Sequence, residues 1–141
     1  MNREILFRAK CFGNWRYGSY VHFDKKPTHN CCNCNYKDFI VTNEEDGEHY
    51  YPITELSSLG QYTGLKDKNG KKIFEGDIIK LKDYDVFDEE YKEIKGVVEY
   101  SVDRFIIVSG KIEYDLSVYY DTKCKIIGNI TNNPELMKQN N

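Results

Sequence analysis

Apolar and polar residues alternate with a period of two along several parts of the chain, and this pattern predicts β-strands rather than helices. Residues 15–23 (WRYGSYVHF) show it most clearly, because Trp15 and Tyr17 fall on one face and Arg16 and Tyr20 on the other. Short apolar runs between turn-forming residues extend the prediction to the rest of the chain. We expect strands over residues 5–10, 15–23, 39–42, 49–53, 73–81, 96–102, 105–109 and 124–130.

Glycine and asparagine mark the turns between these strands. Asn69-Gly70 predicts a hairpin with a two-residue type I′ turn, in which Asp67 faces Lys72 across the strands. Glycine inside a strand indicates a bulge or a bend, so the strand over 73–81 is expected to bend at Gly76. Further hairpin turns are expected at residues 43–47 and 103–104.

Four segments lack the strand pattern. Residues 53–59 (ITELSSL) indicate a single helical turn capped by Thr54, and residues 82–94 a loop with a ragged helical piece. The pattern over 112–121 is ambiguous. The final NNPELMKQ predicts a short helix, because Asn133 can cap it and Pro134 suits the first helical position.

About eight short strands separated by turns favour a mostly β fold with a barrel-like core, a small appended hairpin and a short C-terminal helix. The length of 141 residues suits a single domain over residues 1–141, with room for two lobes. The apolar residues of the late strands should contribute to its core. These are Val97, Phe105, Ile107, Ile126 and Ile130.

Composition narrows the class of protein. No apolar run approaches the ~18 residues that cross a bilayer, and charges interrupt the N-terminal apolar stretch, so we expect a cytoplasmic protein without a membrane partner. The formal net charge of -3 argues mildly against nucleic acid as the main partner. The 12 tyrosines suit half-buried sheet positions or an interaction surface.

The residue patterns support none of three kinds of catalytic or ligand site. Gly64 and Gly70 are one residue too far apart for a phosphate loop, and no Ser or Thr follows Lys71. Glu75 and Asp77 are two residues apart, but a bend at Gly76 would separate them and leave Asp77 to cap the turn. No GxSxG or HExxH motif is present, so we expect no enzyme, no catalytic residues and no cofactor.

The cysteines are the best metal candidates in the sequence. Cys31 and Cys34 have the spacing of a zinc knuckle, and His29 lies near them. A structural zinc site needs a second pair of ligands, which Cys11 or Cys124 would have to provide in space. The interpretation that we favour is therefore thiols without a metal.

Three blocks of sequence together resemble the YopX family. They are REILFRAK at the start, QYTGLKDKNGKKIFEGDII in the middle and IIGNI followed by NPEL near the end. The resemblance implies a mostly β fold and a phage or prophage origin. It implies no activity, and no functional residues can be carried over from it.

Two functions remain open. The one that we favour is a non-catalytic protein-interaction module, which should expose a tyrosine-rich apolar patch or form a symmetric homo-oligomer. The alternative is a small β-barrel that binds single-stranded nucleic acid, in which the basic stretch gathers with aromatic rings in one groove. That stretch comprises Tyr62, Lys66, Lys68, Lys71, Lys72 and Lys80.

Overall fold

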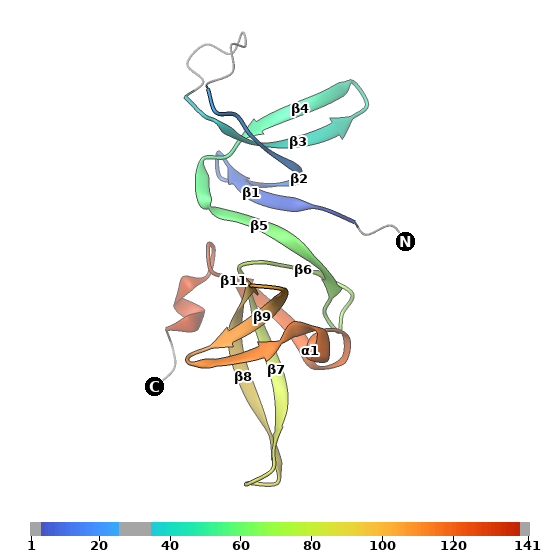
Figure 1. Ribbon diagram of the computed structural model, residues 1–141, viewed down its shortest axis with the longest axis vertical. Helices are drawn as coiled ribbons and strands as arrows, with labels where there is room; N and C mark the ends of the chain where they lie inside the picture. Colours follow the sequence, from blue (N-terminus) through green and yellow to red (C-terminus); the bar gives the residue numbers. More distant parts are fainter. Residues whose placement is uncertain (1–3, 26–34, 139–141) are drawn as a thin grey trace. The chain divides into compact units, whose positions relative to one another are not determined.

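The computed structural model describes residues 4–25 and 35–138, which form eleven strands in two antiparallel sheets and one short α-helix (Figure 1). The mostly β prediction is therefore confirmed. The chain divides into two compact units, Met1–Gln61 and Tyr62–Asn141. The strand β5 (Glu55–Lys66) begins in the first unit and ends in the second. That the chain is a single domain stays a prediction.

The first unit is an antiparallel sheet in the order β4-β3-β2-β1-β5. Its strands are β1 (Phe7–Cys11), β2 (Asn14–His22), β3 (Asp38–Glu44), β4 (Gly47–Pro52) and the first half of β5. Alternate residues point to one face, where Ala9, Cys11, Ile40 and Ile53 form a small core. The strands predicted over 5–10, 15–23, 39–42 and 49–53 are all present.

The helical turn predicted over residues 53–59 is wrong. The segment is extended, and Arg8 of β1 pairs with Gly60 of β5. Thr54 does not cap a helix; its Oγ1 accepts a hydrogen bond of 3.0 Å from the backbone N–H of Phe12. Its own N–H donates to the carbonyl of Lys10, so Thr54 fixes the start of β5 against the β1–β2 turn.

The second unit contains a five-stranded antiparallel sheet in the order β10-β9-β8-β7-β11. The short β6 pairs instead with the second half of β5. The elements are β6 (Lys72–Phe74), β7 (Asp77–Asp85), β8 (Glu90–Ser101), β9 (Arg104–Ser109), β10 (Ile112–Asp115), α1 (Leu116–Lys123), β11 (Cys124–Asn129) and the 3-10 helix η1 (Pro134–Met137). In the described part of the chain β10 and β11 do not pair, so the barrel-like detail is not confirmed.

The hairpin predicted at Asn69-Gly70 is present, but its turn differs from the prediction. Lys66, rather than Asp67, faces Lys72. The loop closes through the N–H of Asp67, which donates to the carbonyl of Lys71, and only Gly70 has a positive φ, of 80°. This is a longer loop with glycine in the left-handed region, because Asp67 turns inward instead of pairing across the strands.

The bend predicted at Gly76 is confirmed. Its φ of 89° lies in the region that only glycine adopts without strain. Its N–H donates to the carbonyl of Val98, and its carbonyl accepts from the N–H of Ile130. The turn between β6 and β7 is thereby held against β8 and the end of β11.

Residues 82–94 were predicted to be a loop, and this is wrong. They form most of the outer part of the β7–β8 hairpin, with Lys82 paired to Glu93 and Tyr84 to Tyr91. Among the described residues no third strand pairs with this part of the hairpin, which extends beyond the rest of its sheet (Figure 1). Most side chains from Lys82 to Glu93 are exposed, which explains why the hydrophobic alternation is missing.

The predicted core residues are partly correct. Ile107 is fully buried, and Phe105 and Ile126 pack against the core cluster. On β8 the fully buried residue is Val98 rather than Val97, which is half-buried on the opposite face. Ile130 is wrong as a core residue: it lies after the end of β11 and is 42% exposed.

The C-terminal helix is present as η1, one turn of 3-10 helix. Asn133 does not cap it through its side chain. The Oδ1 of Asn133 instead accepts a hydrogen bond of 3.2 Å from the N–H of Asn129, at the end of β11. No helix in residues 4–25 and 35–138 has both the length and the apolar character that crossing a bilayer requires.

Candidate functional site

The buried polar side chains of the central stretch are used by the fold. The hydroxyl of Thr63 donates to the carbonyl of Ile73 at 2.8 Å. The Oδ2 of Asp77 accepts from the N–H of Phe74 at 2.8 Å, as expected of a residue that caps the turn at Gly76. Thr63 and Asp77 are thus both engaged by the backbone of the β6 region.

The carboxylate of Asp67, in the loop at residues 67–71, is buried, with 4% of the residue's surface exposed. It accepts hydrogen bonds from the N–H groups of Asn69, Lys71 and Ile126, at 2.9, 3.0 and 3.0 Å. Burial raises the pKa of Asp67, but these three donors outweigh it and hold the pKa below its ordinary value. The bond to Ile126 joins the loop to β11.

The predicted cysteine cluster, with Cys31, Cys34 and His29, lies outside the described residues. Cys11 and Cys124 are buried free thiols, and each belongs to the core of its own unit. Burial raises the pKa of the Cys124 thiol to about 12, which makes it a poor metal ligand or nucleophile at neutral pH.

A second group of metal-binding side chains, which the sequence patterns did not single out, lies at the β3–β4 turn. Ligand atoms of Glu44, Asp46 and His49 fall within 4.8 Å of one another, and the two carboxylates are exposed. The Nε2 of His49 lies 2.6 Å from Asp46, and Tyr51 donates to Glu44 at 2.7 Å. These groups already bond to one another, so their arrangement is explained without an ion.

The outer face of the second unit's sheet carries an unusual row of like charges. Lys80 on β7 lies directly opposite Lys125 on β11 and opposite Lys95 on β8. Directly opposed residues on antiparallel strands share a face, and like charges in such pairs destabilise a sheet. The row therefore opposes folding locally, which is the property expected of a site that binds an anion.

Three more lysines surround this row, and together the six are called the lysine face. Its members are Lys68, Lys80, Lys82, Lys95, Lys123 and Lys125. They line two adjoining hollows, of about 320 Å³ and about 520 Å³, that share Lys80 and Glu93. Glu93 forms an ion pair of 3.1 Å with Lys80, and it is the only carboxylate that lines either hollow in the described part of the chain.

An aromatic pair borders the lysine face toward the end of the hairpin. Tyr84 and Tyr91 lie opposite each other, with ring centroids 5.2 Å apart in an edge-to-face arrangement. Tyr91 lines the smaller hollow and is 64% exposed. Because side chains alternate along a strand, Tyr84 shares the face of Lys80 and Lys82.

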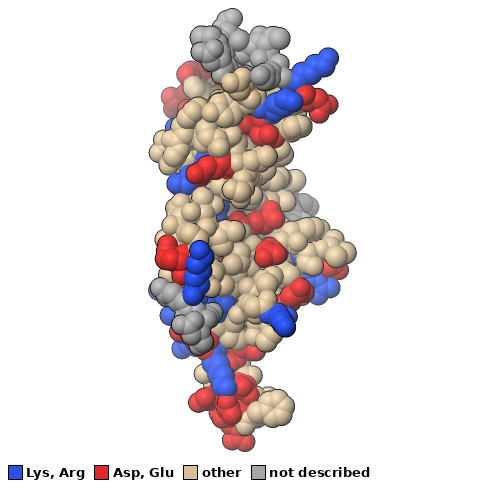
Figure 2. All heavy atoms as spheres, turned by 90° about the vertical axis from the view of Figure 1, so that its left-hand side faces the viewer, with Lys and Arg blue, Asp and Glu red and all other residues tan. Residues whose placement is uncertain are grey.

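The end of the same hairpin is acidic, and residues 83–90 are called the acidic tip. The segment contains five carboxylates and no basic residue. Figure 2 shows acidic side chains gathered at the lower end of the view, where the β7–β8 hairpin ends. Lys92 neutralises part of this charge through ion pairs with Asp85 and Asp88. Phe87 at the tip is 94% exposed.

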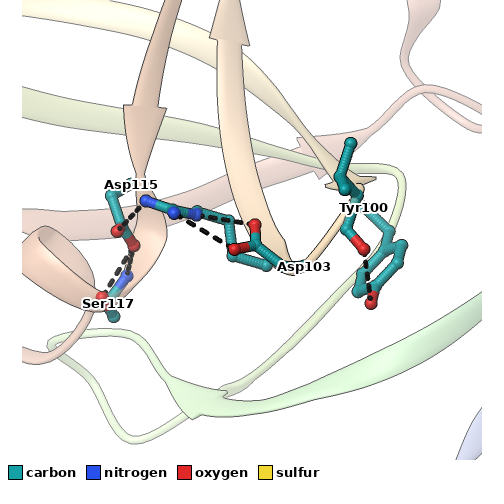
Figure 3. Close-up of polar contacts among 6 residues, drawn as sticks. Tyr100, Asp103, Asp115 and Ser117 are labelled. Atoms are coloured by element: carbon teal, nitrogen blue, oxygen red, sulfur yellow. Dashed lines mark hydrogen bonds and ion pairs between the residues drawn. The ribbon is translucent and has the colours of Figure 1, made fainter.

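A further polar cluster braces the turn between β8 and β9 (Figure 3). The guanidinium of Arg104 bonds to Asp103 at 3.0 Å and to Asp115 at 3.2 Å. Asp115 also caps α1, because its Oδ1 accepts from the N–H of Ser117 at 2.9 Å. All of these bonds stay within the cluster, whose role is to fix the turn against the helix.

The structure brings together only part of the basic stretch that the sequence singled out. Lys68 and Lys80 join the lysine face, whereas Lys72 lies over the ring of Tyr62, 5.3 Å from its centroid. Lys82, Lys95, Lys123 and Lys125 were missed. A signal was available in Lys-Leu-Lys at 80–82 and Lys-Cys-Lys at 123–125, where a buried residue separates two outward lysines.

Comparison with known protein families identifies the family of this chain. The model of the YopX protein family matches residues 6–138. The chain belongs to the YopX family. No curated protein matches this YopX-family chain in sequence.

Among solved structures, the YopX-family chain is similar to protein EF1440 from Enterococcus faecalis. The TM-score is 0.52 at 22% sequence identity, and the alignment covers 96% of this chain and 99% of that chain. At this identity the similarity supports the fold alone.

Proposed function

We propose that this YopX-family protein is a non-catalytic, cytoplasmic accessory protein of a phage or prophage that binds single-stranded nucleic acid through the lysine face. The row Lys125–Lys80–Lys95 is the observation that carries the proposal. Glu93 pairs with Lys80, and phosphates on a flexible strand can neutralise the lysines on either side of Lys80 at several positions at once. The resemblance of the sequence blocks supports the phage or prophage origin.

The size and composition of the face favour a strand over a single phosphate. The lysines of the row occur on the three adjacent strands β11, β7 and β8, and the exposed Tyr84–Tyr91 pair borders them. Exposed rings beside a basic groove are the arrangement on which unpaired bases stack while the backbone follows the cations. The proposal does not require the predicted barrel-like closure, because the lysine face lies on an open part of the sheet.

The charge distribution supports the same function despite the net charge of -3. The described lysines of the face have one carboxylate, Glu93, within ion-pair distance, while acidic residues concentrate at the tip. Two regions of opposite sign on one unit can attract a polyanion in a defined place and orientation.

Fluorescence anisotropy of a labelled oligothymidylate at two salt concentrations tests the proposal. Wild type should bind with an affinity that falls as salt rises, and the Lys95→Gln, Lys125→Gln variant should bind more weakly. Because this variant neutralises about two fewer phosphates, its slope of log affinity against log salt should be shallower by about 1.4.

The matched control is the Lys37→Gln, Lys111→Gln variant, which has the same net charge but changes exposed lysines outside the face. Its affinity should remain near that of wild type. Equal losses in both variants, or binding that salt does not weaken, would show that the lysine face is not the binding site.

A protein-binding role, which the sequence favoured, is supported by a different observation. Phe87 is 94% exposed at the end of a hairpin whose tip is strongly acidic. An exposed aromatic ring surrounded by charge is a common anchor of protein interfaces. This feature favours a protein partner at the acidic tip.

A further inference from the structure

The β7–β8 hairpin carries its basic and acidic regions on opposite sides of its tyrosine pair. Tyr84 lies four residues after Lys80, and β7 ends one residue later, at Asp85. Tyr91 lies four residues before Lys95, and β8 begins one residue earlier, at Glu90, after the turn that carries Phe87. Four residues of extended chain span about 13 Å, so Lys80 and Lys95 lie about 13 Å from the pair on one side, and the acidic turn lies on the other side.

We propose that two copies of this chain form a two-fold symmetric dimer through the β7–β8 hairpin, in which the acidic tip of each copy covers the lysine face of the other. The symmetry axis passes beside Tyr84 and Tyr91. A rotation about that axis exchanges the two ends of the hairpin, so one arrangement satisfies both contacts.

Charge complementarity identifies the occupant of the lysine face as a second copy. The tip contributes five carboxylates within residues 83–90, of which Asp85 and Asp88 pair with Lys92, and the face contributes six lysines, of which Lys80 pairs with Glu93. The tip joins β7 to β8, the strands that carry Lys80, Lys82 and Lys95 of the face, so it cannot fold back onto the face without breaking the pairing between these strands. Both regions are therefore available to another molecule.

Phe87 supplies the apolar contact that fixes the register. It is 94% exposed in the isolated chain, which is unfavourable for a ring of this size. The larger hollow of the lysine face has apolar walls, formed by Ile94, Ile127 and Leu136. Its volume of about 520 Å³ is ample for one aromatic side chain. In the dimer each Phe87 occupies the hollow of the other copy.

The tyrosine pairs meet at the axis. Tyr84 and Tyr91 already contact each other edge to face, so two copies bring four rings together. Aromatic residues at the centre of an interface, surrounded by complementary charges, are the usual source of its binding energy. The dimer covers the lysines proposed to bind nucleic acid, so dimerisation and nucleic-acid binding exclude each other. The dimer itself does not depend on the nucleic-acid proposal.

Sedimentation velocity of the full chain, over a range of concentrations at low and high salt, gives the first test. Wild type should change from monomer to dimer as concentration rises at low salt, and high salt should shift this change to higher concentration. A chain that stays monomeric at low salt at every concentration, or that forms higher oligomers without a dimer, would overturn the proposal.

Charge-swapped variants test the pairing itself. The Asp88→Lys, Glu89→Lys, Glu90→Lys variant leaves two carboxylates against three lysines in residues 83–90 and makes the tip basic. The Lys82→Glu, Lys95→Glu, Lys125→Glu variant leaves three lysines against four carboxylates, Glu93 included, and makes the face acidic. Each alone should be monomeric, because its tip and its face then have the same sign. An equimolar mixture should restore a dimer, because both contacts are again between opposite charges. Folded variants, verified by circular dichroism, that remain monomeric when mixed would contradict the arrangement.

A neutral substitution separates this proposal from the proposed function. Phe87→Ser changes no charge and lies at the tip, so it should weaken dimerisation by at least ~10-fold. At protein concentrations where wild type is dimeric, it should also bind oligothymidylate more tightly. If dimerisation is lost but oligonucleotide binding is absent in every variant, only the nucleic-acid proposal fails. If Phe87→Ser dimerises as wild type does, the proposed register is wrong.

Discussion

The carboxylate of Asp67 accepts a hydrogen bond of 3.0 Å from the backbone N–H of Ile126, 59 residues farther along the chain. The same carboxylate organises its own loop through Asn69 and Lys71. One buried side chain thus connects the loop after β5 to the closing strand β11.

Replacing Asp67 with alanine should destabilise the protein by about 3 kcal/mol, because the buried N–H of Ile126 loses its acceptor and the loop loses two more bonds. Urea denaturation at pH 7 measures this loss. Asp121→Ala, at an exposed position of α1, is the control and should change stability by less than about 0.5 kcal/mol. Equal effects would show that the Asp67 bonds contribute nothing specific.

The stability that Asp67 provides should depend on pH. Its pKa is lowered in the folded protein, so its contribution is present above the unfolded pKa of about 3.9 and is lost as pH falls through the folded value. Between about pH 5 and pH 2, the free energy of unfolding of wild type should therefore fall more than that of Asp67→Asn. Parallel loss in the two proteins would contradict this assignment.

Reversing charge in the lysine row should stabilise the fold and abolish the proposed binding of oligothymidylate. In the Lys95→Glu, Lys125→Glu variant Lys80 would lie between two carboxylates instead of two ammonium groups. Each opposite-charge pair contributes about 0.2–1 kcal/mol, so the melting temperature should rise. Differential scanning calorimetry at low salt and low protein concentration measures it. A lower melting temperature would show that the row does not strain the sheet.

The N-cap of α1 should matter more than the ion pair that accompanies it. Asp115→Ala removes the acceptor for the N–H of Ser117 and should cost about 1 kcal/mol. Arg104→Ala removes only exposed ion pairs with Asp103 and Asp115 and should have a smaller effect. Chemical denaturation of the two variants compares them, and a larger effect of Arg104→Ala would contradict the interpretation of the cluster in Figure 3.

Replacing Val102 in the β8–β9 turn should stabilise the protein. It is 94% exposed and has a φ of 29°, a backbone conformation that β-branched residues rarely adopt. Val102→Asn should raise the free energy of unfolding by about 1 kcal/mol, because asparagine tolerates positive φ. Val86→Asn is the control at an exposed valine whose φ is not positive. No gain at Val102 relative to Val86 would show that the turn is unstrained.

Local signals predicted local features well. Gly70 and Gly76 were recognised because positive φ is a property of single positions. The register beside Gly70 was wrong because Asp67 bonds to Ile126, which no local pattern reveals. Residues 53–59 imitated a helix because Ile53, Leu56 and Leu59 recur at helical spacing, although Leu56 is exposed on an extended strand.

The lysine face could be predicted only in part, because strand pairing brings its lysines together. Lys80 was noticed within a basic stretch, but Lys95 and Lys125 reach it through strand pairing across long stretches of sequence. The α-helix α1 was missed because only Leu116 of its residues is buried, which leaves no amphipathic pattern to detect. The lysine row depends on partners that lie 15 and 45 residues from Lys80, and local sequence patterns do not reveal such pairings.

The position of β11 has a consequence for synthesis on the ribosome. It is the last strand of the chain to be made among those described, yet it pairs with β7, which was made some forty residues earlier. Until residues 124–129 emerge, Ile79 and Leu81 belong to a strand with one edge unpaired, and exposed edges of this kind promote aggregation. A nascent chain stalled just before Cys124 should therefore be a substrate for chaperones, whereas one stalled well after Asn129 should not.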